Sequence, residues 1–417
     1  MQTQLAPEFK GTPAGDEAEA ILRKCVHCGF CTATCPTYQL LGDELDGPRG
    51  RIYLMKQVLE GHAPTRKTQL HLDRCLTCRN CETTCPSGVD YGHLVEIGRR
   101  VVDDKVVRPA GERAVRWLLK EGLTSPLFAP ALKVGQMLRP LLPPALKHKV
   151  PAPAGAEAHR WPTRSHPRAV LLLAGCVQPA MMPNINSATA RVLDAAGIRT
   201  LVADEAGCCG AIRAHLGDHE GGLAHMRQNI DAWWPSVAAG KVEAIVMNAS
   251  GCGATVKDYG HALAHDRAYA DKARRISALT KDLSELLPDL VPRLKDKLRR
   301  RRHTHLAFHP PCTLQHGMQL RGGVEAGLAE LGFDVQLAPR ESHLCCGSAG
   351  TYSVLQPELA YALRDRKLEQ LAPLQAQVIV SANIGCIQHL QSGTATPVRH
   401  WIEVVDEALA NQESVRE

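Results

Sequence analysis

The sequence lacks several features that mark common classes of protein. Aromatic residues make up only 4% of its 417 residues, which argues against a protein that stacks nucleic-acid bases on aromatic side chains. No window reaches the roughly 18 apolar residues that span a bilayer. The segment Met1–Lys24 lacks the basic start and apolar core of a secretion signal. We therefore expect a protein of the reducing cytoplasm.

Motifs that bind nucleotide cofactors are also missing. No G-x-G-x-x-G follows an expected strand, and the spacing of Gly322, Gly323 and Gly327 does not fit that motif. The sequence has neither a G-x4-G-K-S/T phosphate loop nor a nucleophile elbow. These absences predict that the chain carries no flavin or NAD, and that hydride chemistry takes place on another polypeptide.

The formal net charge of +6 does not by itself indicate a nucleic-acid partner. It counts every cysteine as neutral, and eight thiolates around two four-iron clusters lower it to about +2. The basic run Arg293–His303 stands alone in the sequence. We interpret this run as a solvated helix end or a docking site for an acidic partner, and we expect no nucleic-acid binding.

Sixteen cysteines are the main feature that is present. Eight lie between Cys25 and Cys85, four between Cys176 and Cys252, and four between Cys312 and Cys386. In a reducing compartment, clustered cysteines indicate metal or redox chemistry rather than disulfide bonds.

The first block contains one motif twice, C-x2-C-x2-C-x3-C-P. Three cysteines at two-residue gaps wrap one face of a cubane cluster, and the fourth, before proline, completes the other cluster. A zinc ribbon would leave the third cysteine and the Cys-Pro pair unexplained. The spacing therefore predicts two 4Fe–4S clusters that transfer single electrons. The predicted ligands are Cys25, Cys28, Cys31 and Cys85 for cluster 1, and Cys75, Cys78, Cys81 and Cys35 for cluster 2.

Helical periodicity and proline content divide the N-terminal part of the chain. Pro48–Gly61, between the two motifs, has its apolar residues at helical spacing, so we expect an α-helical ferredoxin-like domain over residues 1–125. Arg49 and Arg51 in this helix either pair with cluster charge or a partner, or are ordinary cations of the helix start. Nine prolines between Pro126 and Pro167 predict a partly extended linker over residues 126–167.

The second and third cysteine blocks belong to an internal repeat. Each begins with an apolar strand that ends on cysteine, continues with a helix and a short strand, and passes a Cys-Cys-Gly loop. Each ends with a strand that leads into Gly-Cys, which we expect to open a helix. The pattern predicts two duplicated α/β cysteine-rich modules, at 168–295 and 303–417. The whole chain is thus expected to be a multidomain α + α/β protein.

The cysteines of each module follow expected strand ends, where open α/β sheets have their binding crevice. We expect four thiols to converge in each module. They are Cys176, Cys208, Cys209 and Cys252 in the first, and Cys312, Cys345, Cys346 and Cys386 in the second. Adjacent cysteines suit a site with several metal atoms or a disulfide, so a further cluster, a zinc ion, and redox or structural thiols remain open. His309, His316 and His343 flank the second set as ligands, proton donors or plain polar loop residues.

The order of these motifs resembles a known family. A doubled ferredoxin motif followed by two Cys-Cys-Gly modules is similar to subunits of heterodisulfide reductase, anaerobic glycerol-3-phosphate dehydrogenase and lactate-utilisation proteins. The wider family has Cys-x-x-Cys at the end of each module, whereas this chain has Ala249 and Asn383 at the first of those positions. Four stretches resemble more specifically the iron–sulfur subunit of bacterial glycolate oxidase, also called glycolate dehydrogenase. They are His309–Gly317, Ser342–Ser353, Ser381–Leu390 and Thr396–Glu403.

The resemblance implies an electron-transfer subunit with no catalytic residue assigned in this chain. It would receive electrons from FAD-containing subunits that oxidise glycolate to glyoxylate, and pass them to a quinone or another membrane acceptor. The family works as a heteromeric complex on the cytoplasmic face of the inner membrane. Alternatives are an equivalent subunit for lactate or glycerol 3-phosphate, or a terminal reductase acting at the paired cysteines. The basic and apolar stretch Trp117–Val150 either contacts an anionic bilayer or packs over the ferredoxin domain.

Overall fold

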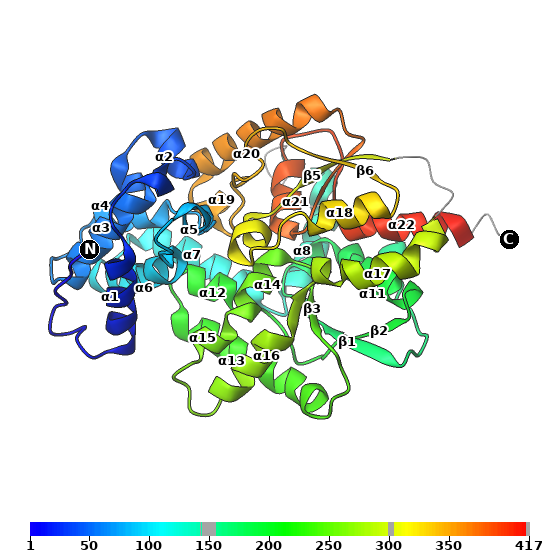
Figure 1. The fold of residues 1–417 in the computed structure, drawn as a ribbon, viewed down its shortest axis with the longest axis horizontal. Coiled ribbons are helices and arrows are strands. Elements are labelled where there is room, and N and C mark those ends of the chain that lie inside the picture. The colour runs from blue at the N-terminus through cyan, green and yellow to red at the C-terminus, as the bar shows by residue number, and fades with distance from the viewer. Residues whose placement is uncertain (142, 144–155, 299–303, 414–417) are drawn as a thin grey trace.

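The computed structural model describes residues 1–141, 143, 156–298 and 304–413. Its N-terminal part is helical and lies at one end of the molecule, in blue in Figure 1. The helices of this part are α1 (Pro13–Lys24), α2 (Pro36–Leu41), α3 (Pro48–Leu59), α4 (Arg66–Asp73), α5 (Asn80–Thr84) and α6 (Tyr91–Lys105). The prediction of a helical N-terminal domain is confirmed.

Helix α3 forms where the apolar spacing predicts a helix, and it packs against α6. Pro48 stands in the first turn of α3, where its missing amide hydrogen is tolerated. Ile52 and Met55 are buried in the core of this domain. Gly98 of α6 permits the close approach, because a Cβ there would lie 2.4 Å from the Met55 Sδ. The two cysteine motifs flank α3 in the sequence and are therefore held on one common core.

The rest of the described chain contains two parallel four-stranded sheets with equivalent strand orders, β2-β1-β3-β4 and β6-β5-β7-β8. Leu171 of β1 pairs with Ile245 of β3, and Leu306 of β5 pairs in the same way with Val378 of β7. This repetition confirms the two duplicated α/β modules. The strands are β1 (Arg168–Leu172), β2 (Ile198–Leu201), β3 (Ile245–Met247), β4 (Thr280–Asp282), β5 (His305–His309), β6 (Asp334–Leu337), β7 (Val378–Ser381) and β8 (Val398–His400).

Helices pack on both sheets (Figure 1). Those of the first module are α10 (Gln178–Met181), α11 (Pro183–Ala195), α12 (Ala211–His215), α13 (His219–Ala238), α14 (Ser250–Lys257), α15 (Tyr259–Ala262), α16 (Ala270–Leu279) and α17 (Leu287–Leu294). Those of the second are α18 (Gly323–Glu330), α19 (Tyr352–Leu355), α20 (Pro357–Leu371), α21 (Ile384–Gln391) and α22 (Trp401–Glu413). Helices α14 and α21 begin beside the last cysteine of their modules, as the Gly-Cys pairs predict.

The two modules pack against each other through one continuous hydrophobic core. Helix α11 of the first module contacts α22 of the second, where Arg191 Nη2 lies 2.7 Å from Asp406 Oδ2. The hydroxyl oxygens of Ser250 and Thr313 are 2.7 Å apart. Ser250 begins α14 and Thr313 follows Cys312, so the cysteine loops of the two modules lie next to each other.

Helix α7 (Ala110–Thr124) connects the helical domain to the first module. Its Arg116 pairs with Asp73 of α4 at 3.1 Å, and its Lys120 pairs with Asp218 before α13 at 3.2 Å. Neither α7 nor α8 (Phe128–Leu138) has a buried residue, so their apolar side chains face solvent. The described part of Trp117–Val150 thus bridges two domains through its charges and also exposes an apolar surface.

Parts of two predicted segments lie outside the described residues. The segment assigned to a linker, 126–167, contains helix α8, and its residues 142 and 144–155 are not described. Residues 299–303 of the basic run Arg293–His303 also lie outside the described residues. Within the described ranges, no helix combines the length and the apolar character needed to cross a membrane.

Candidate functional site

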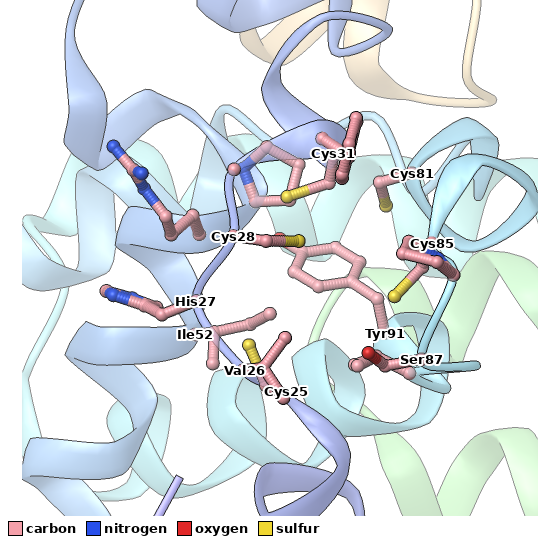
Figure 2. Close-up of a pocket in the computed structure, with 16 residues that line it drawn as sticks. Cys25, Val26, His27, Cys28, Cys31, Ile52, Cys81, Cys85, Ser87 and Tyr91 are labelled. Atoms are coloured by element: carbon pink, nitrogen blue, oxygen red, sulfur yellow. The ribbon is translucent and has the colours of Figure 1, made fainter.

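The first three cysteines of the first motif, together with Cys85, surround one pocket near the surface of the helical domain. Figure 2 shows the sulfur atoms of Cys25, Cys28, Cys31 and Cys85 around this space, with Cys81 beside them. Burial, followed by the charges of the other three thiols, raises the pKa of Cys31 to about 11. Bound iron relieves such repulsion by neutralising the thiolates. The four sulfurs brought together here are those predicted for cluster 1.

This first site is accessible from outside the molecule. Cys28 is exposed, and the neighbouring Val26 and Phe30 are 69% and 62% exposed. Arg49 of α3 lines the same pocket, where its Nε lies 2.6 Å from Glu44 Oε1. Exposed apolar side chains around a redox centre suit a docking surface.

Cys35 and the first three cysteines of the second motif form a separate group. Cys35, Cys75 and Cys81 are buried, and Cys78 is half-buried. Burial raises the pKa values of Cys78 and Cys81 far above the ordinary value of a thiol. The charges of neighbouring thiols, including Cys35 and Cys75, act in the same direction. The four members of this group are those predicted for cluster 2.

Two arginines balance the negative charge of the second group. Burial opposes ionisation of Cys75, but the charges of Arg51 and Arg99 outweigh it and lower the pKa of Cys75. Arg51 is 1% exposed and donates a hydrogen bond to the carbonyl of His71 at 2.7 Å. Arg99 donates to the carbonyls of Leu72 and Cys75 at 2.7 and 2.6 Å. Of the two open interpretations of Arg51, the structure therefore favours pairing with cluster charge. Sequence analysis missed Arg99, which lies in α6, beyond both motifs.

The chemistry of these donors fits 4Fe–4S clusters. None of the sixteen cysteines, all of which lie in the described ranges, forms a disulfide bond. Each group offers four sulfur ligands, the set that such a cluster requires. The side chains present are thus compatible with a 4Fe–4S cluster at each of the two predicted sites.

The second cysteine group lies directly against the second α/β module. Cys78 packs with Cys312 and Cys345 in one hydrophobic cluster. The charge of Cys312 also contributes, after burial, to the raised pKa of Cys78. Hydrogen bonds across this contact join Asn80 to His343, Thr83 to His316, and Tyr352 to Arg74.

The four cysteines of the second module form a continuous row. Cys312 contacts Cys345, which contacts the adjacent Cys346. Cys346 contacts Cys386 in turn. The buried ammonium of Lys367, a residue that sequence analysis missed, lies beside this row and donates to the carbonyl of Glu341. Burial lowers the pKa of Lys367, although the neighbouring thiols favour its charged form.

The first module repeats this row of thiols. The neighbouring thiols of Cys176 and Cys209 lower the pKa of Cys208. Cys209 contacts Cys252 in turn, and His225 also contacts Cys208. Both modules therefore bring together the four thiols expected of them. In contrast to the second module, the described contacts of Cys78 do not extend to this row.

The backbone conformation of each Cys-Cys-Gly loop explains why its third residue is glycine. Gly210 and Gly347 have φ angles of +96° and +89°, in the left-handed region that favours glycine. A Cβ on Gly347 would lie 2.3 Å from the carbonyl oxygen of Ala360. The amides of Gly210 and Gly347 donate to the sulfurs of Cys208 and Cys345, each at 3.4 Å. The loop thus orients the first cysteine of each pair.

The histidines flanking the second module differ in their contacts. His316 is buried, and its ring nitrogens are hydrogen-bonded to Thr83 and to the carbonyl of His343. His316 thus holds two domains together as a polar loop residue. His309 is also buried, but its ring nitrogens have no hydrogen-bond partner among the described residues.

Comparisons with known proteins agree with this arrangement. The family described as a 4Fe-4S dicluster domain matches residues 21–89, and the family described as a cysteine-rich domain matches 170–257 and 306–391. The chain is 56% identical to the glycolate oxidase iron-sulfur subunit of Escherichia coli, over 99% of this chain and 100% of that protein. It is 31% identical to the probable glycolate oxidase iron-sulfur subunit of Bacillus subtilis, over 94% of this chain and 92% of that protein.

A more distant relative matches nearly the whole chain. It is a component of the dihydromethanophenazine:CoB--CoM heterodisulfide reductase of Methanosarcina barkeri, and it is 23% identical over 93% of this chain and 94% of that protein. The full-length matches above 30% identity decide the assignment. The chain belongs to the family of glycolate oxidase iron–sulfur subunits and is an electron-transfer subunit of an oxidoreductase.

Proposed function

We propose that this chain serves a glycolate dehydrogenase complex, in which FAD-containing partner subunits oxidise glycolate to glyoxylate. The name of the E. coli relative and its 56% identity over nearly the whole chain support this substrate. Cys25, Cys28, Cys31 and Cys85 would hold one 4Fe–4S cluster, and Cys75, Cys78, Cys81 and Cys35 the other. Such clusters supply one-electron transfer. A quinone or another membrane acceptor would receive the electrons.

The observation that carries this proposal is the position of the thiol groups relative to one another. Cys28 of the first group is exposed between apolar side chains, whereas Cys78 of the second group contacts the second module. The chain thus offers an entry at its surface and a continuation into its interior. The three family matches fall inside the proposed domains 1–125, 168–295 and 303–417, with 126–167 between the first two.

The substrate is tested on the assembled complex purified without oxygen. We expect glycolate to reduce an artificial electron acceptor, and expect bleaching of the iron–sulfur absorbance of this chain when the acceptor is left out. Lactate and glycerol 3-phosphate serve as competing donors in the same assay. Turnover with lactate alone would assign the chain to a different 2-hydroxy acid.

We also propose that the chain sits on the cytoplasmic face of the inner membrane through α7 and α8. Trp117 and Leu118 of α7 are 61% and 64% exposed, and further exposed apolar residues follow in and around α8. These are Leu127, Val134, Met137, Leu138 and Leu141. Arg113 lines a surface hollow together with Trp117 and adds positive charge there, which suits anionic lipid.

Flotation with vesicles of anionic phospholipid tests this contact. Trp117→Ser with Leu118→Ser should lower the bound fraction about tenfold or more, since each large apolar side chain contributes about 1.5–3 kcal/mol on burial. Val354→Ser is the matched control, because Val354 is 49% exposed but lies in the second module. Equal flotation of all three proteins would exclude α7 as the membrane contact.

A further inference from the structure

Two histidines and two carboxylates gather where the helical domain faces the first module (Figure 1). Glu17 lies on α1 and His93 on α6, whereas Asp258 directly precedes α15, which contains His261. The two imidazole rings are stacked, with their centroids 3.9 Å apart and an angle of 8° between their planes. Each carboxylate lies close to both rings. The four residues therefore form one compact group that joins the two domains.

Glu17 approaches one nitrogen of each ring. Its Oε1 lies 2.8 Å from Nε2 of His261 and 3.6 Å from Nδ1 of His93. One ligand atom from each of these three residues lies within 4.8 Å of the other two. Nitrogen and oxygen ligands of a tetrahedral zinc ion lie about 2.0–2.2 Å from the metal, and hence about 3.3–3.6 Å from one another. Small side-chain movements thus bring the three atoms to the spacing that zinc requires.

Asp258 approaches the opposite nitrogen of each ring. Its carboxylate lies 3.3 Å from Nε2 of His93 and 3.8 Å from Nδ1 of His261. In metal sites, a ligating histidine commonly donates its other ring N–H to a carboxylate, which fixes the orientation of the ring. Here a single aspartate is placed to orient both histidines. The group thus contains the ligands of a metal site and the residue that supports them.

The charges of the group also favour a divalent cation over bound protons. A hydrogen bond with Asp258 raises the pKa of His93, and a hydrogen bond with Glu17 raises the pKa of His261. The charge of His93 opposes protonation of His261, because two stacked cations repel each other. When both rings are neutral, the two carboxylates leave two negative charges. A divalent cation balances these charges without placing a proton on either ring.

We propose that Glu17, His93 and His261 bind a zinc ion that joins the helical domain to the first module. Asp258 is the positioning residue for both histidines. Imidazole suits zinc, and three protein ligands leave the fourth position for water. The side chains of Glu17 and His261 are 32% and 43% exposed, so the ion can enter from solvent. The site goes beyond the proposed function because zinc transfers no electrons. It fixes the helical domain on the first module, whereas hydrogen bonds of α5 fix it on the second.

Equilibrium dialysis against zinc tests the proposal on the full-length, iron-loaded protein purified without oxygen. Wild type should bind about one zinc per chain more than His261→Gln, whose affinity for this ion should fall at least about 100-fold. Thiols elsewhere in the chain contribute equally to both proteins. Asp258→Asn should weaken binding about 10- to 100-fold, as loss of a residue that orients a ligand does. His265→Gln is the matched control, because His265 is exposed and lies four residues after His261, outside the group. It should bind zinc as wild type does.

X-ray absorption at the zinc edge identifies the ligands. The zinc that distinguishes wild type from His261→Gln should have nitrogen and oxygen neighbours at about 2.0–2.2 Å and no sulfur neighbours at about 2.3 Å. Unchanged iron content and circular dichroism should show that His261→Gln is folded.

Hydrogen exchange measures whether the ion joins the two domains. With zinc at about ten times its dissociation constant, exchange of the α15 amides should slow about tenfold in wild type, because opening of α15 has to release the ion. The rate should not change in His261→Gln. Equal zinc binding by wild type and His261→Gln, a shell of sulfur neighbours, or unaltered exchange in wild type would each overturn the proposal.

Discussion

Cys78→Ser is expected to remove about four irons per chain and to lower turnover of the assembled complex at least about 100-fold. Loss of a group that merely supports a metal ligand already costs about 10- to 100-fold in affinity or activity, and Cys78 is proposed as a ligand itself. Its position makes the effect larger still. Cys78 packs against the hydrophobic cluster that contains Cys312 and Cys345, so its loss removes a ligand at the contact with the second module. Turnover with a quinone acceptor and iron analysis measure the two effects.

The matched variant at the other site is Cys28→Ser. Cys28 occupies the same place in the first motif as Cys78 in the second, but it is exposed at the surface of the molecule. If electrons enter at the exposed site, substrate should still reduce the first cluster in Cys78→Ser, whereas no cluster should be reduced in Cys28→Ser. Electron paramagnetic resonance, recorded after substrate is added without an acceptor, shows which clusters are reduced in each variant. Rapid reduction of the second cluster in Cys28→Ser would contradict the proposal that electrons pass through the first cluster before the second.

The grouping of the first three cysteines of each motif could be predicted from the sequence because it depends on short-range geometry. Cys25, Cys28 and Cys31 are separated by two residues each, and such loops turn their sulfurs to one centre whatever surrounds them. The duplication of the modules could be predicted from the sequence for a similar reason. Each repeat carries its own strand, loop and cysteine signals, and the two sheets have equivalent strand orders.

Other features depend on contacts between distant parts of the chain. The two modules look equivalent in the sequence, but Asn80 and Thr83 hydrogen-bond to the second one beside the cluster 2 site, through partners more than 200 residues away. The fourth strand of each sheet also escaped sequence analysis. Strand β4 reads Thr-Lys-Asp and β8 reads Val-Arg-His, and neither shows an apolar run or alternation that indicates a strand.

Arg51 shows how a residue noted in the sequence acquires its role only in the folded protein. From the sequence, Arg49 and Arg51 are two similar cations in the first turns of α3. In the structure, Arg49 pairs with Glu44 where both side chains are about one-third or more exposed. Arg51 instead lies buried between Asp46 and Thr37, and the thiols of Cys35 and Cys75 favour its charged form.

Arg51→Met is expected to destabilise the helical domain by about 3 kcal/mol, the lower end of the range for breaking a buried ion pair. The lower end applies because Arg74 continues to pair with Asp46, at 2.8 Å. The urea concentration at which the cluster absorbance is lost should fall by about 1–3 M. The same substitution removes a positive charge beside Cys75, so the reduction potential of the second cluster should fall, since reduction adds negative charge.

Arg49→Met is the control that separates these effects from the loss of any arginine in α3. Its ion pair is partly exposed, so its loss should cost less than about 1 kcal/mol. The reduction potential of the second cluster should stay at the wild-type value, because Arg49 lines the pocket of the first cysteine group. A redox titration followed by electron paramagnetic resonance compares the two variants directly. If both shifted the second cluster equally, the buried position of Arg51 would have no special electrostatic effect, and the charge balance argued for Cys75 would be wrong.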